Sequence, residues 1–289
     1  MKFNVFKPVS ELNHIVKQYV VIESLEDIER MLFLPDGGNF IVFNQGLIGC
    51  SNVYNGLTFD IPQKYSVSIK TNKVKKAIIN ANLNLKTVCF PLILVELRPV
   101  GFYKLFHKDA SVLNHGYMEL DDDIIDSYFS RLYKHKSIAD EIAYLNTTLK
   151  SLDASHKNER LCVEDVIDAM IHEYRYDVTI QALVDQFSCS RSTMERKFKK
   201  YIGFTPKNFL LISKFTETLL SYIEDECTFH DIDYIYSDNS HMNRVFKKIL
   251  GIVPSEIFNE VLNENIRIYQ LSQTKALAEN EFYDQVYFC

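Results

Sequence analysis

The chain has 289 residues, of which 47% are hydrophobic and 24% are charged, and its formal net charge is −6. This length favours two domains over one, and the balance of apolar and charged residues argues against a disordered chain. Without a signal peptide or an apolar run long enough for a transmembrane helix, we expect a cytoplasmic protein and no membrane partner. The six cysteines form no CxxC pair or Cys/His cluster, which predicts reduced thiols and no metal site.

Residues up to about 106 are expected to form strands. From Asn39 onward, the segment NFIVFNQGLIGCSNVY alternates β-branched and aromatic residues with glycine and asparagine turn signals. The sequence LPDGG at residues 34–38 predicts a turn, because proline presets φ and glycine permits a positive φ. The segment FPLILVELRPVGFYKLF at residues 90–106 predicts a continuous buried strand. Several short strands with regular turns predict an antiparallel sandwich or barrel.

From about residue 120 the pattern becomes helical. Apolar residues recur every three or four positions over residues 124–132 and again over 138–149, and three aspartates at 121–123 suit a helix N-terminus. This amphipathic stretch is either a dimer contact or a helix packed against its own β-domain. The polar segment DASHKNER at residues 153–160 has no periodicity and is the expected linker.

A basic sequence occurs twice in the C-terminal half. Residues 194–206 read MERKFKKYIGFTP and residues 242–254 read MNRVFKKILGIVP, with seven of thirteen positions identical at an offset of 48 residues. Ser190 and Asp238 correspond at the same offset, and both are good N-cap residues. A repeat of this period indicates a duplicated supersecondary unit.

Each unit predicts a helix-turn-helix. In the first, a short helix at residues 179–187, capped by Thr179, precedes a three-residue turn and a second helix capped by Ser190. Met194 and Phe198 lie on one apolar stripe of this second helix, basic residues lie on the opposite face, and Gly203 ends it. A capped basic helix after a short turn is typical of a recognition helix that enters the major groove.

Local charge and helix length agree with DNA binding. Between residues 190 and 215 there are seven Lys or Arg against one acid, although the whole chain is acidic. Residues 206–223 contain no helix breaker, and a helix of that length is about 27 Å long. With its flanking turns, such a helix can hold two recognition helices at the spacing of successive major grooves, about 34 Å.

These residues resemble the AraC/XylS family of bacterial transcription regulators over about residues 161–260. The first copy matches the family's basic run at Ser190, Met194, Arg196, Phe198, Lys199, Gly203 and Pro206. The second copy matches it at Asp238, Ser240, His241, Met242, Arg244, Phe246, Lys247, Gly251 and Pro254. The resemblance implies a seven-helix DNA-binding domain in which a long helix joins two helix-turn-helix modules.

The resemblance also implies which side chains contact DNA. Base edges would be read by Ser192, Glu195, Arg196, Asn239, Ser240, Asn243 and Arg244. Phosphates would be contacted by Arg191, Lys199, Lys200, Lys247 and Lys248. The chemistry agrees, because a guanidinium can bond guanine O6 and N7 together, whereas lysines on phosphates position a protein without reading sequence.

The second unit departs from the family pattern. Asp231 and Asp233 lie in its expected scaffold helix, and Ile235 and Tyr236 stand where the family usually has Gly-Phe. Exposed acids there would repel phosphates. We therefore expect the first module to supply most of the affinity for DNA.

The N-terminal half resembles the regulatory part of a subgroup of this family, through LPDGG and then RPVG at residues 98–101. RPVG is either a strand end and turn or part of a ligand site. The expected fold class is α+β, with a β-rich N-terminal regulatory domain and an all-α DNA-binding domain. The expected boundaries are a sensor or dimerisation domain at 1–152 with closing helices at 121–152, a linker at 153–160, a double helix-turn-helix domain at 161–262 and a tail at 263–289.

The sequence thus predicts a transcriptional regulator that binds double-stranded DNA and needs no cofactor. Activation, RNA polymerase as a partner, a small-molecule effector and a homodimer are further expectations from the resemblance. Two alternatives remain: a degenerate helix-turn-helix protein that acts only through protein contacts, and an enzyme fused to a DNA-binding domain. No catalytic sequence pattern supports the enzyme.

Overall fold

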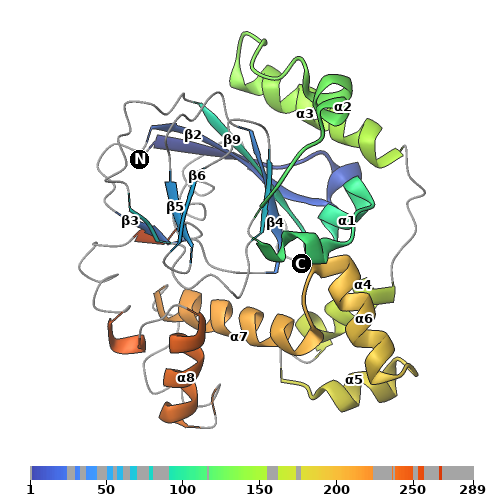
Figure 1. Cartoon of the computed structure of the whole chain (residues 1–289), viewed down its shortest axis with the longest axis vertical. Coiled ribbons are helices and arrows are strands. Elements are labelled where there is room, and N and C mark those ends of the chain that lie inside the picture. Colours follow the sequence, from blue (N-terminus) through green and yellow to red (C-terminus); the bar gives the residue numbers. More distant parts are fainter. Residues whose placement is uncertain are drawn as a thin grey trace.

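The computed structural model describes the chain in segments that together span most of its length. They are residues 2–24, 30–32, 37–43, 51–54, 57–60, 66–69, 78–80, 91–115, 117–154, 162–173, 177–223, 236, 238–249, 253–256 and 267–268. A β-rich N-terminal part lies above an all-helical part in Figure 1, which is the expected α+β class.

Antiparallel strands form the N-terminal part, as expected. The largest sheet has six strands in the order β1-β2-β9-β4-β7-β10. Its strands are β1 (Lys2–Phe6), β2 (Val16–Ser24), β4 (Asn39–Phe43), β7 (Ser66–Ile69), β9 (Leu92–Leu97) and β10 (Tyr117–Glu119). A hairpin joins β5 (Ser51–Tyr54) to β6 (Leu57–Asp60).

A second, smaller sheet joins strands that are far apart in the sequence. It contains β3 (Arg30–Leu32), β8 (Ile78–Asn80) and β11 (Arg267–Ile268), and β11 pairs in parallel with β3. Because β11 follows the helical part, the chain passes from the N-terminal part into the helices and returns to it.

The strand β9 lies at the centre of the six-stranded sheet and is buried, as its apolar sequence predicts. Its register aligns Glu96 with Gln18 of β2. The Glu96 side chain is 0% exposed, and its carboxylate accepts hydrogen bonds from Gln18 Nε2 at 2.7 Å and Lys17 Nζ at 3.0 Å. These donors offset the cost of burying a charge within a sheet.

Helices cover one face of the six-stranded sheet. Figure 1 shows α2 (Asp122–Ile124) and α3 (Ile138–Ala154) on the side of this sheet away from β5 and β6. Ile142, Leu145 and Leu149 of α3 pack in the same hydrophobic core as the strands. Of the two alternatives for this amphipathic stretch, packing against its own β-domain is therefore the one observed. Helix α3 also extends two residues into the expected linker.

The expectation of strands up to about residue 106 is wrong at its end, because residues 101–106 form helix α1 (Gly101–Phe106). A turn follows β9, in which the Gly101 amide donates to the Arg98 carbonyl at 2.8 Å. Phe102, Leu105 and Phe106 then lie on one buried helical face. Three apolar residues over five positions are too few to distinguish a short helix from the end of a strand.

The helical part follows the expected order. It contains α4 (Cys162–Asp168), a π-helix at Ala169–Glu173, α5 (Ile180–Gln186), α6 (Arg191–Ile202), α7 (Pro206–Ile223) and α8 (Asn239–Ile249). Helix α7 spans the 18 residues predicted for the long connecting helix. Among the described helices, none combines the length and apolarity that crossing a bilayer requires.

Replacing Gly101 with alanine should destabilise the N-terminal part, because a Cβ there would lie 2.6 Å from the Ile15 carbonyl oxygen. We expect a loss of about 1–3 kcal/mol in the free energy of unfolding, measured by urea titration. Val112→Ala, at a side chain that is 41% exposed, is the control and should stay within about 0.5 kcal/mol of the parent. Equal stability of Gly101→Ala and the parent would contradict the close backbone approach.

Candidate nucleic-acid interface

The first helix-turn-helix unit consists of α5, a short turn and α6. The Thr179 side chain accepts a hydrogen bond from the Ala182 amide at 3.1 Å, so the predicted cap of α5 is confirmed. Ser190 caps α6 in the same way, by accepting from the Thr193 amide at 3.2 Å. Gly203 ends α6 with a φ of 100°, the left-handed conformation that glycine adopts without strain.

Helix α6 has one buried face and one polar face. Met194, Phe198 and Ile202 are each at most 2% exposed, as their spacing predicts. Most of the predicted DNA contacts on α6 are exposed, namely Arg191, Ser192, Arg196, Lys199 and Lys200. Glu195 is only half-exposed, and its carboxylate accepts from Arg191 Nε at 3.1 Å.

The second unit repeats this design around α8. Asp238 Oδ1 accepts a hydrogen bond from the His241 amide at 2.6 Å, which confirms the predicted capping role. The side chains of Met242 and Phe246 are buried. The predicted DNA contacts of this helix are all exposed, namely Asn239, Ser240, Asn243, Arg244, Lys247 and Lys248.

Both recognition helices are anchored on α7 through aromatic side chains. Phe198 of α6 lies edge-on to Phe209 of α7, with 6.2 Å between ring centroids. Phe246 of α8 lies edge-on to Phe215 of α7 at 4.8 Å. Helix α7 therefore sets how the two polar faces are placed relative to each other.

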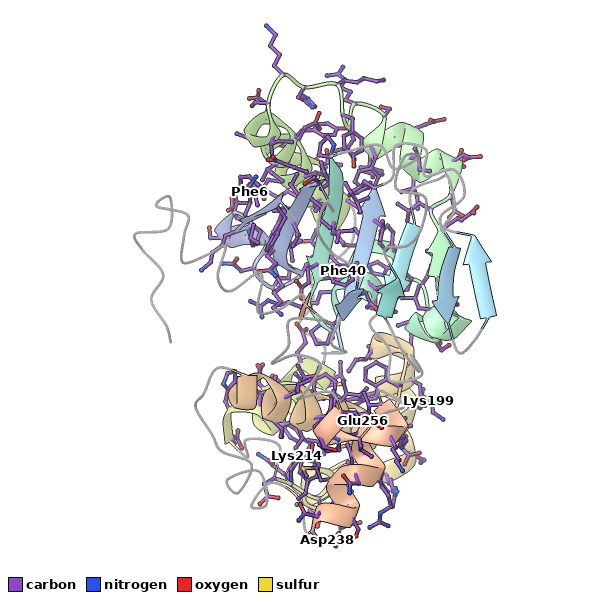
Figure 2. All side chains as sticks on the ribbon, turned by 90° about the vertical axis from the view of Figure 1, so that its left-hand side faces the viewer. Phe6, Phe40, Lys199, Lys214, Asp238 and Glu256 are labelled. Carbon is purple, nitrogen blue, oxygen red and sulfur yellow. The ribbon has the colours of Figure 1, made fainter. Side chains whose placement is uncertain are left out.

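The recognition helices lie at the two ends of α7, and their N-terminal ends point away from the β-rich part (Figure 1). Figure 2 shows Asp238, which caps α8, at the end of the helical part farthest from the sheet, and Lys199 of α6 at the outer surface. Helix N-termini are the ends that contact base edges in helix-turn-helix proteins. The arrangement thus leaves the base-reading ends accessible.

The residues that depart from the family pattern in the second unit are only partly described. Asp231, Asp233 and Ile235 lie outside the described residues, so the expectation of a weaker second module remains a prediction. Tyr236 is 4% exposed and lies edge-on to the His241 ring, with 5.6 Å between centroids. Burial raises the pKa of Tyr236 to about 12. This tyrosine is therefore part of the packed interior of the module.

The structure adds two contacts of α6 that the sequence did not predict. Lys197 Nζ donates to Cys162 Sγ of α4 at 3.0 Å, and this hydrogen bond is the main cause that raises the pKa of Lys197. The other contact is with α1 of the N-terminal part, where the Tyr103 ring lies 4.6 Å from the Tyr201 ring. Both join residues far apart in the sequence, and no local pattern signals such pairs.

The acidic and metal-ligating side chains of the described segments are not arranged as a metal site. Within those segments no group of three or more His, Cys, Asp or Glu is placed to hold a metal ion. The polar side chains that do gather are the basic and amide groups of α6 and α8. They suit a polyanionic partner.

Comparison with known proteins gives the same class of domain. Residues 183–260 match a protein-family model described as a helix-turn-helix domain. The HTH-type transcriptional activator RhaS from Escherichia fergusonii is 25% identical over 119 residues, which are 38% of this chain and 43% of that protein. The matched region is therefore less than half the length of that relative.

Two similar solved structures are of ToxT from Vibrio cholerae O395. One has 12% identity and a TM-score of 0.39, covering 89% of this chain and 96% of that chain. The other, bound to (E)-4-(8-methylnaphthalen-1-yl)but-3-enoic acid, has 12% identity and a TM-score of 0.40, covering 89% of this chain and 97% of that one.

Removing either cap should loosen its recognition helix. Ser190→Ala and Asp238→Ala each leave an amide of the first helical turn without its side-chain acceptor. We expect each to lower the free energy of unfolding by about 1 kcal/mol, whereas Ser190→Gly should cost only a few tenths. Urea titration followed by circular dichroism checks this. Identical losses for the alanine and glycine variants of Ser190 would contradict a capping role.

Burial of Tyr236 should make stability depend on alkaline pH. The folded chain holds the Tyr236 proton more tightly than the unfolded chain, because the pKa is raised from 10.0 to about 12. The stability that comes from burying the protonated hydroxyl is fully present below pH 10 and is lost as the pH rises towards 12. We expect the parent to lose more stability than Tyr236→Phe over that interval, in paired urea titrations. Parallel pH profiles for the two proteins would show that the hydroxyl is not buried.

Proposed function

We propose that the chain is a transcription regulator of the AraC/XylS type and that it binds specific DNA sequences through two recognition helices. The match of residues 183–260 to a helix-turn-helix domain model and the similarity to RhaS support this proposal. Helix α6 and helix α8 would enter successive major grooves on one face of the duplex. One chain would then make the pair of contacts that other helix-turn-helix proteins make as dimers.

The observation that carries this proposal is the pair of capped helices with exposed polar faces at the two ends of α7. The apolar faces of α6 and α8 are buried against α7 and the rest of the helical part. Their arginine, lysine, asparagine and serine side chains lie on exposed faces, where a partner can reach them. Arginine and asparagine suit base edges, and lysine suits phosphates, so duplex DNA fits both kinds of side chain.

The length of α7 supports contact with two grooves. Its 18 residues correspond to about 27 Å of helix, to which the turn between α6 and α7 at residues 203–205 adds further distance. The repeat of the major groove along one face of B-form DNA is about 34 Å. A shorter connecting helix would place both modules over the same groove.

Within this proposal the roles of the residues differ. Bases would be read by Ser192, Glu195, Arg196, Asn239, Ser240, Asn243 and Arg244. Phosphates would be held by Arg191, Lys199, Lys200, Lys247 and Lys248. The Arg191–Glu195 ion pair would orient Glu195, which suits acceptance of a hydrogen bond from the cytosine amino group.

The N-terminal part would regulate this DNA-binding unit. We propose activation as the direction of regulation, because the similar protein RhaS from E. fergusonii is a transcriptional activator. RNA polymerase would then be a protein partner. A small-molecule effector or a second copy of the chain would act through the β-rich domain.

Substituting one base-reading residue and one phosphate-binding residue tests the proposal. Arg196→Ala should weaken specific binding by about 1–3 kcal/mol and relax base preference at one position, because it removes a bidentate base contact. Lys199→Ala should weaken binding to all sequences and reduce the salt slope by about one unit, because it removes a phosphate contact. Gel shifts on the DNA upstream of the gene, with selection of bound random duplexes, measure both effects.

Arg244→Ala tests the second module in the same way. It should weaken specific binding less than Arg196→Ala does, because the first module is expected to supply most of the affinity. Equal effects of Arg196→Ala and Lys199→Ala on specific and non-specific DNA would contradict the assigned roles. No binding by the parent protein at low salt would instead favour a helix-turn-helix protein that acts through protein contacts alone.

A further inference from the structure

We propose that the N-terminal domain restrains the first recognition helix through Lys200, and that the Tyr103 ring competes with a DNA phosphate for the Lys200 ammonium. This inference rests on the proposed DNA-binding function. It adds a specific regulatory contact between the two parts of the chain.

The contact joins α1 of the β-rich part to the C-terminal end of α6. The Tyr103 ring meets the Tyr201 ring edge-on, with 4.6 Å between centroids and 74° between planes. Lys200 Nζ lies 5.4 Å from the centroid of the Tyr103 ring and 5.4 Å from that of Tyr201. Both distances are within the range of cation–π attraction, which is about 6 Å. The ammonium is therefore shared between two aromatic rings, one from each part.

Buried neighbours hold Tyr103 in this position. Lys104, the next residue of α1, forms an ion pair with Glu164 of α4 at 2.9 Å, and the two side chains are only 8% and 16% exposed. Val100, which precedes α1, is 3% exposed and packs in the hydrophobic core of the helical part. An ion pair and an apolar side chain are thus both buried between the β-rich part and the helical part. They hold α1 against α4 and α6.

A second close approach lies beside α7. A Cβ at Gly37, just before β4, would lie 2.7 Å from Phe209 Cε2. The first helix-turn-helix module is thus held by the β-rich part both directly, through α6, and indirectly, through α7, on which α6 is anchored. Its orientation is set jointly by α7 and by the N-terminal domain.

The contact between α1 and α6 determines whether the Lys200 ammonium can reach a DNA phosphate. A lysine that binds a phosphate must direct its ammonium to the phosphate oxygens, which takes it off the aromatic rings. Cation–π attraction draws the ammonium towards the rings and therefore opposes the phosphate contact. Movement of α1 away from α6 would release Lys200 and add one phosphate contact to the first module.

The test uses the full-length chain and a random-sequence DNA duplex, because phosphate contacts do not depend on sequence. Tyr103→Leu keeps an apolar side chain but removes the ring. We expect it to bind the duplex about threefold to tenfold more tightly than the parent, with a steeper salt dependence by about one unit. Tyr103→Phe keeps the ring and should bind as the parent does.

A double-mutant cycle separates the contact with Lys200 from general loosening of the fold. In the Lys200→Gln background, Tyr103→Leu should no longer raise affinity, because the competing ammonium is absent. A retained effect in that background, or affinity of Tyr103→Leu equal to or below that of the parent, would overturn the proposed competition. Thermal unfolding of each variant identifies any that fails to fold, in which case Tyr103→Met replaces Tyr103→Leu as the variant without the ring, with the same expected and contradicting results.

The outcome also distinguishes this inference from the proposed function. If the parent binds DNA and Tyr103→Leu does not differ from it, only the restraint by Tyr103 is wrong. If no variant binds DNA at low salt, the DNA-binding function and the restraint both fail.

Discussion

The burial of two aromatic residues against α7 is the constraint on which the DNA-binding surface depends. Phe198 packs edge-on against Phe209, and Phe246 packs edge-on against Phe215. An amphipathic helix whose apolar stripe is fixed in this way must turn its polar face outward. The polar faces of α6 and α8 are therefore presented from one rigid connecting helix, and the separation of the two modules follows from its length.

The β-rich part is joined to this surface more closely than a flexible linker would allow. Helix α1 contributes Val100 to the core of the helices and Lys104 to a buried ion pair. After the second module, β11 pairs with β3 and returns the chain to the N-terminal part. The DNA-binding unit is thus held by chain connections on both sides and by docked side chains. Any change in the N-terminal domain that shifts α1 has a direct route to α6.

Much of the helical part could be predicted because its signals are local. The caps at Thr179, Ser190 and Asp238 each involve an amide three residues away, so the sequence alone identifies them. The length of α7 follows from the absence of a helix breaker between Pro206 and Ile223. The order of the strands and helix α1 could not be predicted in the same way. Strand pairing joins distant residues, and a six-residue helix carries too short a pattern to distinguish it from a strand.

The sequence by itself determined that the chain carries two copies of a basic, capped helix and that their polar faces suit DNA, because periodicity, capping and charge are properties of neighbouring residues. Only the tertiary structure decided which partners those helices have. It placed Tyr103 beside Lys200, Glu96 between Gln18 and Lys17, and β11 beside β3. Such contacts form when separate elements pack together, and their energy depends on distances that no local pattern of residues specifies.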